Sequence, residues 1–318
     1  MRLQHNVYGG HMWQITLYLI PLGVLIATIL LFIEFERRKN KFSPFTEKFL
    51  RNPGYTLQKD LDKEGEPIVF YLMLAVVVPM VYIIKWNQLT QISHIAYIIT
   101  ISLVMIYVVF RLRKTFKNCW AIRLGLEGEI YTGQELNFLM RLGAWVYHDV
   151  PYKYGNIDHI VVSTGGVFVV ETKAIRKPSG KNSRAEYKVT YKDGVLKFPH
   201  AVTSKPINQA ICHAKYLSNF IKKDTNVEID VIPVVALPGW YVDIGKNDNG
   251  VMVINPKRGS ALSGHVTKEK ISENDAQLIA QRIENYARNV VSSSEMGDPD
   301  AHKKYDIFIN RKEEKNEL

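Results

Sequence analysis

Three long apolar runs in the first third of the chain constrain its fold more than any other feature. They cover residues 13–33, 67–84 and 92–110, and each approaches the roughly 20 residues that a helix needs to cross about 30 Å of hydrocarbon. Trp13 and Trp86 stand near the ends of these runs, where aromatic rings favour the membrane interface. The runs therefore predict three transmembrane helices. A buried hairpin of a soluble protein is the alternative for the second and third runs.

The charges between the runs predict an orientation. The loop 34–66 carries eight Lys and Arg residues, and four more fall within 111–117, whereas 85–91 holds only Lys85. Because cytoplasmic loops are enriched in positive charge, 34–66 and everything after 111 are expected in the cytoplasm, with the N-terminus outside. No Asp, Glu or Arg interrupts the apolar cores. We therefore expect an anchor in a bacterial inner membrane and disfavour a transporter or channel.

Beyond the membrane region the composition is that of an ordinary soluble domain. The sequence divides into a membrane anchor at 1–117, a folded domain at 118–291 and a polar, flexible tail at 292–318. The two cysteines, Cys119 and Cys212, form no CxxC or Cys/His cluster, which argues against a structural zinc site. The net charge of +10 suits either an anionic membrane or a polyanionic ligand.

Periodicity predicts an α/β fold for the soluble domain. A mixed central sheet flanked by helices is expected, because short β-branched runs alternate with helical patterns. The expected helices are 118–142, 205–223 and 273–290, and the expected strands are 144–150, 157–163, 167–173, 187–191, 194–198, 228–237 and 250–255.

The passage that carries chemistry is a predicted hairpin. With Gly165-Gly166 as its two-residue loop, Asp158 stands opposite Lys173, and alternation puts both on one face with Glu171. Two carboxylates in that position repel each other, and a divalent cation between Asp158 and Glu171 would relieve the repulsion. Ligation by oxygen atoms suits Mg²⁺ or Mn²⁺, which can activate water for phosphodiester hydrolysis. An ordinary salt bridge to Lys173 is the alternative.

Four motifs follow one another over roughly residues 120–240: Gly125-Leu126-Glu127-Gly128-Glu129, Ile157-Asp158-His159, the run Gly166 to Lys173, and Pro206-x-x-Gln209. In this order they resemble the nuclease-related domain (NERD) of the PD-(D/E)xK nuclease superfamily. Ile157 replaces the proline usual in the superfamily, as it does in the NERD pattern. The resemblance implies a restriction-endonuclease-like core.

The resemblance also implies a set of catalytic residues. Glu129 is implied as a third acid and Gln209 as a polar residue from the later helix. The set expected to be catalytic is Glu129, Asp158, Glu171, Lys173 and Gln209, with Asp158 and Glu171 as the metal ligands. From the residues alone, Glu129 and Gln209 could equally be solvated helix residues, and Gly125 and Gly128 favour close packing over phosphate binding.

Basic residues follow the predicted site directly. From Lys173 to Lys223 there are twelve Lys and Arg against two acids, and Arg176, Lys177, Lys181 and Arg184 form a loop just past the hairpin. Such a segment would track a phosphodiester backbone. A basic surface facing anionic lipid is the alternative.

The expectation is thus a membrane-anchored, metal-dependent nuclease acting on nucleic acid, with DNA favoured, at the cytoplasmic face. Phage defence and plasmid or DNA transfer are contexts that would suit this location. The expected partners are nucleic acid and membrane lipid, with a regulatory protein or a second copy of the chain as restraint. The competing hypothesis is a catalytically inactive, membrane-tethered module that binds nucleic acid or protein.

Overall fold

A computed structural model describes residues 24–25, 27–35, 49–152, 155–177, 187–245, 250–257 and 260–289. The chain divides into two compact units, Met1–Lys48 and Phe49–Leu318. In the first unit the described residues are helical. Most of the first predicted span, 13–33, lies outside the described residues, and so does the predicted tail 292–318.

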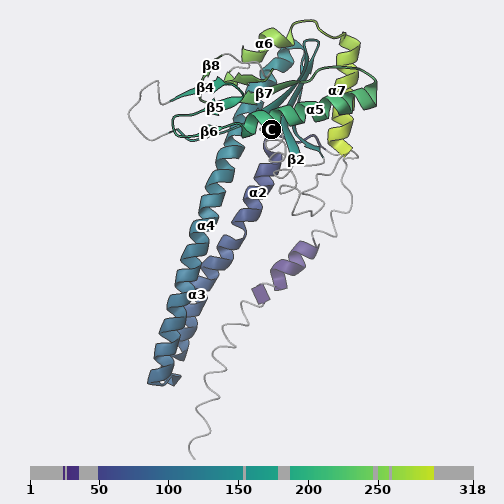
Figure 1. Cartoon of the computed structure of the whole chain (residues 1–318). Helices are drawn as coiled ribbons and strands as arrows, with labels where there is room; N and C mark the ends of the chain where they lie inside the picture. The colour runs from purple at the N-terminus through teal and green to yellow at the C-terminus, as the bar shows by residue number, and fades with distance from the viewer. Residues whose placement is uncertain are drawn as a thin grey trace, which may run out of the picture. The chain divides into compact units, whose positions relative to one another are not determined.

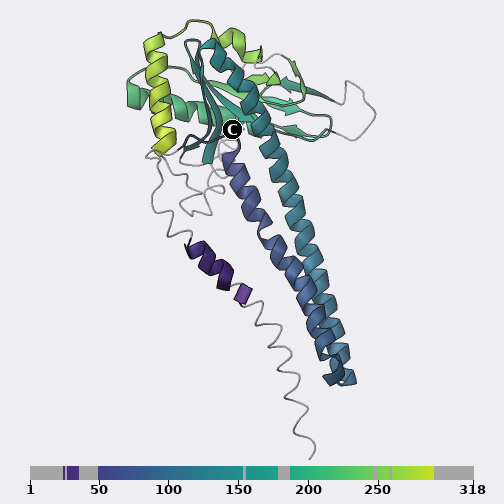
Figure 2. The same ribbon diagram turned by 180° about the vertical axis from the view of Figure 1, so that it is seen from behind.

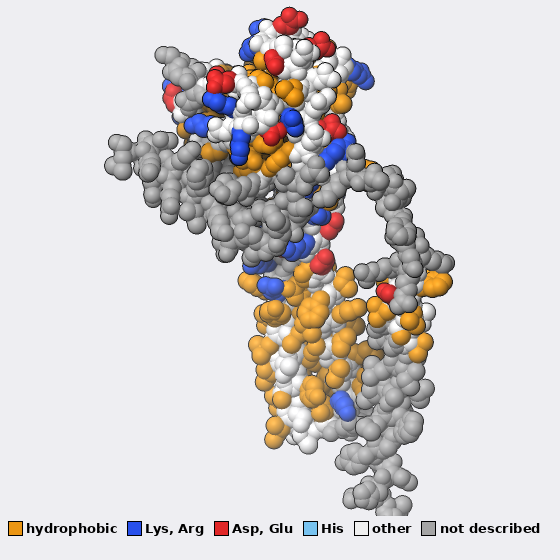
Figure 3. Space-filling model, turned by 90° about the vertical axis from the view of Figure 1, so that its right-hand side faces the viewer, with side chains coloured by type: hydrophobic (Ala, Val, Ile, Leu, Met, Phe, Trp, Pro, Cys, Tyr) orange, Lys and Arg blue, Asp and Glu red, His pale blue; other side chains and the backbone are white. Residues whose placement is uncertain are grey.

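Two helical stretches of the second unit are long and apolar enough to cross a membrane. They are Tyr55–Lys85 and Gln91–Leu142, and only 6% of each apolar window is buried. Phe70 and Ile83 on one stretch and Ile92 on the other are 61%, 70% and 81% exposed, and Figure 3 shows such side chains as a continuous apolar surface. Soluble proteins rarely expose apolar patches of this extent. The described residues thus contain two candidate spans rather than the three expected.

The long helix α4 (Gln91–Asn137) runs across the predicted boundary between the membrane anchor and the folded domain. It joins the third apolar run to the helix expected at 118–142 without a break, and it ends in the 3-10 helix η2 (Phe138–Leu142). The expected boundary at 117/118 therefore lies inside a helix. The charges after residue 110 end the apolar run, but Arg, Lys and Leu are good helix formers and do not end the helix.

The basic loop expected at 34–66 also contains a helix. α2 (Tyr55–Gly65) leads through Glu66, which has helical dihedral angles, into α3 (Pro67–Lys85). A short 3-10 helix, η1 (Trp86–Gln88), then turns the chain into α4. Both α2 and α3 pack along α4. Figures 1 and 2 show these three helices from opposite sides.

The central sheet is mixed, as expected. Its five strands lie in the order β1-β2-β3-β7-β9, with β1, β2 and β3 antiparallel and β3, β7 and β9 parallel. The strands are β1 (Trp145–Tyr152), β2 (Gly155–Ser163), β3 (Gly166–Thr172), β7 (Ile232–Ala236) and β9 (Met252–Ile254).

A second sheet, which the sequence did not predict, contains four strands in the order β6-β5-β4-β8. They are β4 (Lys188–Lys192), β5 (Val195–Lys197), β6 (Val202–Thr203) and β8 (Tyr241–Ile244). Tyr191, Leu196 and Trp240 are fully buried in the core that joins this sheet to the central one. The two short strands expected at 187–191 and 194–198 therefore exist but belong to a separate layer.

Helices cover both faces of the central sheet. α5 (Lys205–Thr225) and α7 (Glu273–Asn289) pack on the face that carries Ile160, Val162 and Val169. The end of α4 and α6 (Ser260–Val266) pack on the face that carries Val161 and Phe168. Two apolar cores thus enclose a nearly fully buried β2–β3 hairpin.

The register of this hairpin differs from the predicted one by two residues. Ser163 pairs with Gly166 and Val162 with Val167, so the loop is Thr164-Gly165 rather than Gly165-Gly166. Continuing the register puts Asp158 opposite Glu171, and not opposite Lys173 as predicted. Because the shift is an even number of residues, the predicted faces are unchanged.

Candidate active site

Five carboxylic acids line one cavity. The cavity has a volume of about 240 Å³ and is lined from five directions, by α2, α4, the end of β1 with the start of β2, the end of β3, and α5. We name it the acid cavity. Its lining includes the predicted Glu129, Asp158, Glu171 and Gln209, and the residues that the sequence did not single out, namely Thr56, Leu57, Asp60, Asp149, Tyr152, Gly155, Asn156 and His213.

Asp158 and Glu171 form the centre of the site. Asp158 accepts a hydrogen bond from the backbone N–H of Thr172 at 2.7 Å, and this bond fixes its carboxylate beside Glu171. Burial, more than the charge of Asp149, raises the pKa of Asp158 to about 7. Burial and the charge of Asp158 raise the pKa of Glu171 well above its usual range. The pair therefore resists carrying two negative charges without a cation.

Glu129 reaches the site from α4. Gly128 permits this approach, because a Cβ there would lie 2.6 Å from the Cβ of Ala174, just past β3. The backbone N–H of Gly54 donates a hydrogen bond to Glu129, while burial and the charges of neighbouring carboxylates raise its pKa to about 10. Gly125 and Gly128 thus serve close packing, and Glu129 lines the acid cavity rather than a solvated helix face.

Asp149 is one of two acids, with Asp60, that the sequence did not reveal at this cavity. It has a φ of 48° within β1, in the left-handed region that non-glycine residues rarely adopt. Its carboxylate accepts hydrogen bonds from Arg51 Nη1 at 3.0 Å and from Thr56 Oγ1 at 2.8 Å. Asn156 Nδ2 donates to Thr56 Oγ1 at 2.6 Å and completes the network. The segment that leads into α2 therefore holds one wall of the cavity.

The same segment contacts α4 closely at two glycines. A Cβ on Gly54, whose φ is 73°, would lie 2.5 Å from Leu126 Cδ1. A Cβ on Gly133 would lie 2.4 Å from Pro53 Cγ. The Arg51–Thr56 segment is therefore a packed part of the site and not a loop beside it.

α5 contributes Gln209 and His213, which are one turn apart and share a face. His213 Nδ1 lies 3.4 Å from Glu171 Oε2, and its Nε2 lies 3.0 Å from the hydroxyl of Tyr152. Burial lowers the pKa of His213 to about 4, so the ring is neutral. If Tyr152 donates to Nε2, the ring proton sits on Nδ1 and is directed at Glu171. His213 Nδ1 therefore faces the carboxylate of Glu171 at a distance longer than an ordinary hydrogen bond.

Two amide oxygens complete a set of hard donors. Gln209 Oε1 and Asn156 Oδ1 are buried, and neither has a hydrogen-bond partner within the described ranges. Carboxylate and amide oxygens suit a hard divalent cation. As they stand, no three His, Cys, Asp or Glu side chains of the described residues lie close enough to hold a metal ion. The chemistry of the donors fits such an ion, and ligation would need these side chains to draw together.

Lys173 lies beside the acid cavity. Its backbone N–H donates to the carbonyl of Ala236 at 2.9 Å, which continues the pairing of β3 with β7. Its charge lowers the pKa values of Asp158 and Glu171 and offsets part of the effect of burial. Lys205, at the start of α5, acts on Glu171 in the same direction, a contribution that the sequence analysis missed.

Of the four basic residues that the sequence predicts to bind nucleic acid, the structure describes Arg176 and Lys177. Arg176 lies over the ring of Trp120 at 5.8 Å, and Lys177 Nζ lies 4.2 Å from the ring centroid of Tyr187. Both cations are exposed. Lys181 and Arg184 lie outside the described residues.

Comparison with known proteins identifies the domain around this site. Residues 124–238 match the family model of the nuclease-related domain, NERD. The match includes Glu129, Asp149, Asp158, Glu171 and Gln209, but it leaves out Arg51 and Thr56. No curated protein and no solved structure matches the chain. Residues 124–238, with the acids that converge on this cavity, are therefore a nuclease-related domain.

Proposed function

We propose that this chain is a membrane-anchored nuclease that uses Mg²⁺ or Mn²⁺ to hydrolyse phosphodiester bonds of nucleic acid, DNA in preference to RNA. The observation that carries the proposal is the meeting of Glu129, Asp158 and Glu171 in one cavity of a nuclease-related domain. The same proposal implies that the central sheet is a restriction-endonuclease-like core.

The acid cavity supplies the groups that such a reaction needs. Asp158 and Glu171 would hold the cation, with the amide oxygens of Gln209 and Asn156 as neutral donors. A bound Mg²⁺ supplies charge neutralisation at the phosphate and lowers the pKa of the attacking water. Glu129 completes the acidic wall opposite β3, and His213 faces the carboxylate of Glu171.

Cationic side chains would act on the substrate. Lys173 follows Glu171 on the same side of the strand, where it can orient the attacking water or neutralise charge that develops on the phosphate. Arg176 and Lys177 would bind flanking phosphates, and Lys181 and Arg184 have the same proposed role. None of these roles requires a base contact, so sequence-independent cleavage is expected.

Two further observations support a membrane location. α3 and the first part of α4 expose apolar side chains around most of their surface. The basic residues of 34–66 and 111–117 favour the cytoplasmic side for both ends of this helix pair. There the enzyme would meet nucleic acid that enters during phage infection or plasmid transfer. Resistance of the chain to extraction by alkaline carbonate tests the anchor, and release into the soluble fraction would contradict it.

The decisive test of catalysis uses the full chain in detergent with DNA or RNA and either Mg²⁺ or Mn²⁺. We expect cleavage that EDTA abolishes and that Lys173→Ala lowers by roughly 100-fold or more, the usual effect of losing one group that stabilises developing charge. Lys268→Ala, which removes an exposed lysine two residues after α6, is the matched control and should cleave normally. Failure to cleave with either ion, or full activity of Lys173→Ala, would overturn the mechanism.

An inactive binding module is the second candidate, and one observation favours it. The described His, Cys, Asp and Glu side chains do not already form a metal-binding trio. Such a module would bind DNA in a salt-sensitive manner that neither EDTA nor Asp158→Ala alters. A nuclease requires the opposite: Asp158→Ala should remove cleavage and weaken Mn²⁺ binding.

A further inference from the structure

A large groove lies between the edges of the two sheets. It has a volume of about 1210 Å³ and runs between β8, the last strand of the second sheet, and β9, the last strand of the central sheet. We name it the edge groove. One end is apolar and is formed by Ile244, Val251 and Met252. A groove of this size exceeds what one small molecule needs.

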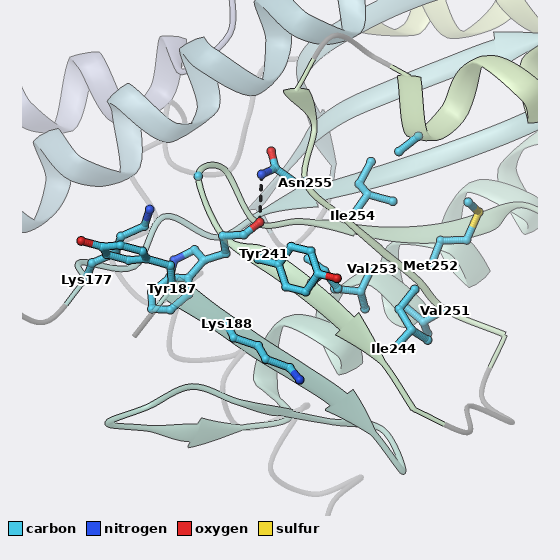
Figure 4. Close-up of a pocket in the computed structure, with 14 residues that line it drawn as sticks. Lys177, Tyr187, Lys188, Tyr241, Ile244, Val251, Met252, Val253, Ile254 and Asn255 are labelled. Atoms are coloured by element: carbon cyan, nitrogen blue, oxygen red, sulfur yellow. Dashed lines mark hydrogen bonds between the residues drawn. The ribbon is translucent and has the colours of Figure 1, made fainter. Parts of the chain in front are cut away.

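The other end of the edge groove combines aromatic rings with a cation. Figure 4 shows Lys177 beside Tyr187 at this end, with Tyr241 and Asn255 nearby. Tyr241 is 68% exposed although it is a large aromatic side chain. Asn255 is held by a hydrogen bond from its Nδ2 to the carbonyl of Trp240 at 2.8 Å. Because Lys188 is paired with Asp243 at 2.7 Å, Lys177 supplies the cationic character of the mouth.

This mouth and the acid cavity both lie where the parallel strands of the central sheet end. Thr172 pairs with Ala236, and Ala236 pairs with Ile254. The strands β3 and β9 therefore end at the same level of the sheet, on either side of β7. Two strand spacings amount to about 10 Å. Lys173 follows Thr172, and Asn255 follows Ile254, so both sites begin where these strands end.

The chain itself connects the two sites. Residues 173–177 lead from Glu171 to the mouth of the groove. Trp240 Nε1 donates to the carbonyl of Ile175 at 3.2 Å and fixes the middle of this connection. Lys173, Arg176 and Lys177 therefore form a basic path that begins beside the acid cavity and ends at Tyr187.

We propose that the edge groove binds the bases of an unpaired nucleic-acid strand whose backbone follows this basic path into the acid cavity. The inference rests on the proposed nuclease function and names its substrate class. Aromatic rings next to cations bind single strands because every base has a face that can stack. Bases of an intact duplex are already stacked and paired, so a duplex cannot fill the groove without opening. An extended peptide pairing with β8 or β9 is the competing occupant.

Binding without cleavage tests the groove separately from the catalytic site. The full chain in detergent is titrated with a fluorescent oligothymidine 12-mer in EDTA, and with a hairpin duplex of the same length. We expect the single strand to bind at least tenfold more tightly. Tyr241→Ala should weaken that binding about 5-fold or more, the loss of one stacked base, and Tyr241→Phe should not. Tyr131→Ala, which removes another exposed tyrosine, is the matched control.

The outcomes separate this proposal from the nuclease proposal. Equal binding of Tyr241→Ala and the unaltered chain, or tighter binding of duplex, overturns the groove assignment even if the chain cleaves DNA. Loss of single-strand binding in Tyr241→Ala supports the groove even if no cleavage occurs. If the oligothymidine does not bind and a peptide of β-forming sequence binds through Tyr241, the groove is a strand-addition site and the proposal is wrong.

Discussion

Replacing Arg51 with alanine removes a cation that holds the wall of the acid cavity. Arg51 Nη1 lies 3.0 Å from Asp149 Oδ2, and the two side chains are only 10% and 4% exposed. Without Arg51, the Asp149 carboxylate keeps its hydrogen bonds from Thr56 but must carry its charge in a region that water reaches poorly. We therefore expect the second unit to lose stability.

The size of the loss follows from burial. Removing one partner of a buried ion pair costs about 3–5 kcal/mol, and the hydrogen bonds that remain to Asp149 favour the lower end, about 3 kcal/mol. In a unit of about 270 residues, Phe49–Leu318, each kcal/mol lowers the Tm by about 2–4 °C, so Arg51→Ala should lower it by roughly 6–12 °C.

Thermal unfolding of the full chain in detergent, followed by near-ultraviolet circular dichroism, measures this shift. The matched control is Arg123→Ala, which removes an arginine from an i,i+4 pair with Glu127 whose side chains are both 63% exposed. Exposed pairs of this kind contribute about 0.3–0.5 kcal/mol, so the control should shift the Tm by about 2 °C at most.

Equal Tm values for the two variants would refute the reasoning. They would mean that the Arg51–Asp149 contact contributes no more than a solvated surface pair, and that the segment before α2 does not hold the site. A large shift in Arg51→Ala that is matched by Arg51→Lys would show that the pairing needs the planar guanidinium and not charge alone.

Three further predictions concern the same cavity. Burial sets the pKa of Asp158 at about 7 and that of Glu129 at about 10, so the folded state binds more protons than the unfolded state above about pH 4. In EDTA the Tm should therefore fall as the pH rises from about 5 to about 8, and Glu129→Gln should make the fall shallower; a Tm that rises with pH would contradict this. In chemical denaturation, Gly128→Ala should lower the free energy of unfolding by about 1–3 kcal/mol, because its Cβ would lie 2.6 Å from the Cβ of Ala174. The control Gly65→Ala meets no atom within 4 Å and should be neutral or slightly stabilising. A fragment of residues 111–318 should unfold at a lower temperature than the same fragment with 49–65 attached by a flexible linker, because 111–318 lacks Arg51, Gly54 and Thr56; identical melting of the two fragments would show that the segment is dispensable.

The faces of the β2–β3 hairpin could be predicted from the sequence, although its register could not. Alternation alone puts Asp158 and Glu171 on one face, and a register shift of two residues preserves that result. The pair Gly165-Gly166 led to a wrong prediction of the loop, because Gly165 is required for close packing against α6. A Cβ on Gly165 would lie 1.9 Å from the carbonyl oxygen of His265, at the end of α6. That contact depends on a helix a hundred residues away and leaves no local signal.

Asp149 could not be predicted for a related reason. Its partners Arg51 and Thr56 are 98 and 93 positions away, within a segment whose composition suggested a basic cytoplasmic loop. Its positive φ turns the side chain out of the alternation that identifies site residues on a regular strand. The nearest sequence signal was Pro53-Gly54 before a helical run, which marks a helix start and says nothing of what packs there.

The structure joins two regions that the sequence separated. α4 carries its apolar run and Glu129 on one uninterrupted helix, and the 19 residues from Phe110 to Glu129 span about 29 Å at 1.5 Å per residue. On the other side of the cavity, the Arg51–Thr56 segment, which binds the carboxylate of Asp149, leads through α2 directly into α3. Two walls of the acid cavity, those formed by α2 and α4, are therefore continuous with the candidate membrane helices. Since α2 continues into α3, and Glu129 lies on α4 itself, we expect a shift of α3 relative to α4 to move Thr56 relative to Glu129. The arrangement of the candidate membrane helices and the geometry of the acid cavity are therefore expected to be coupled.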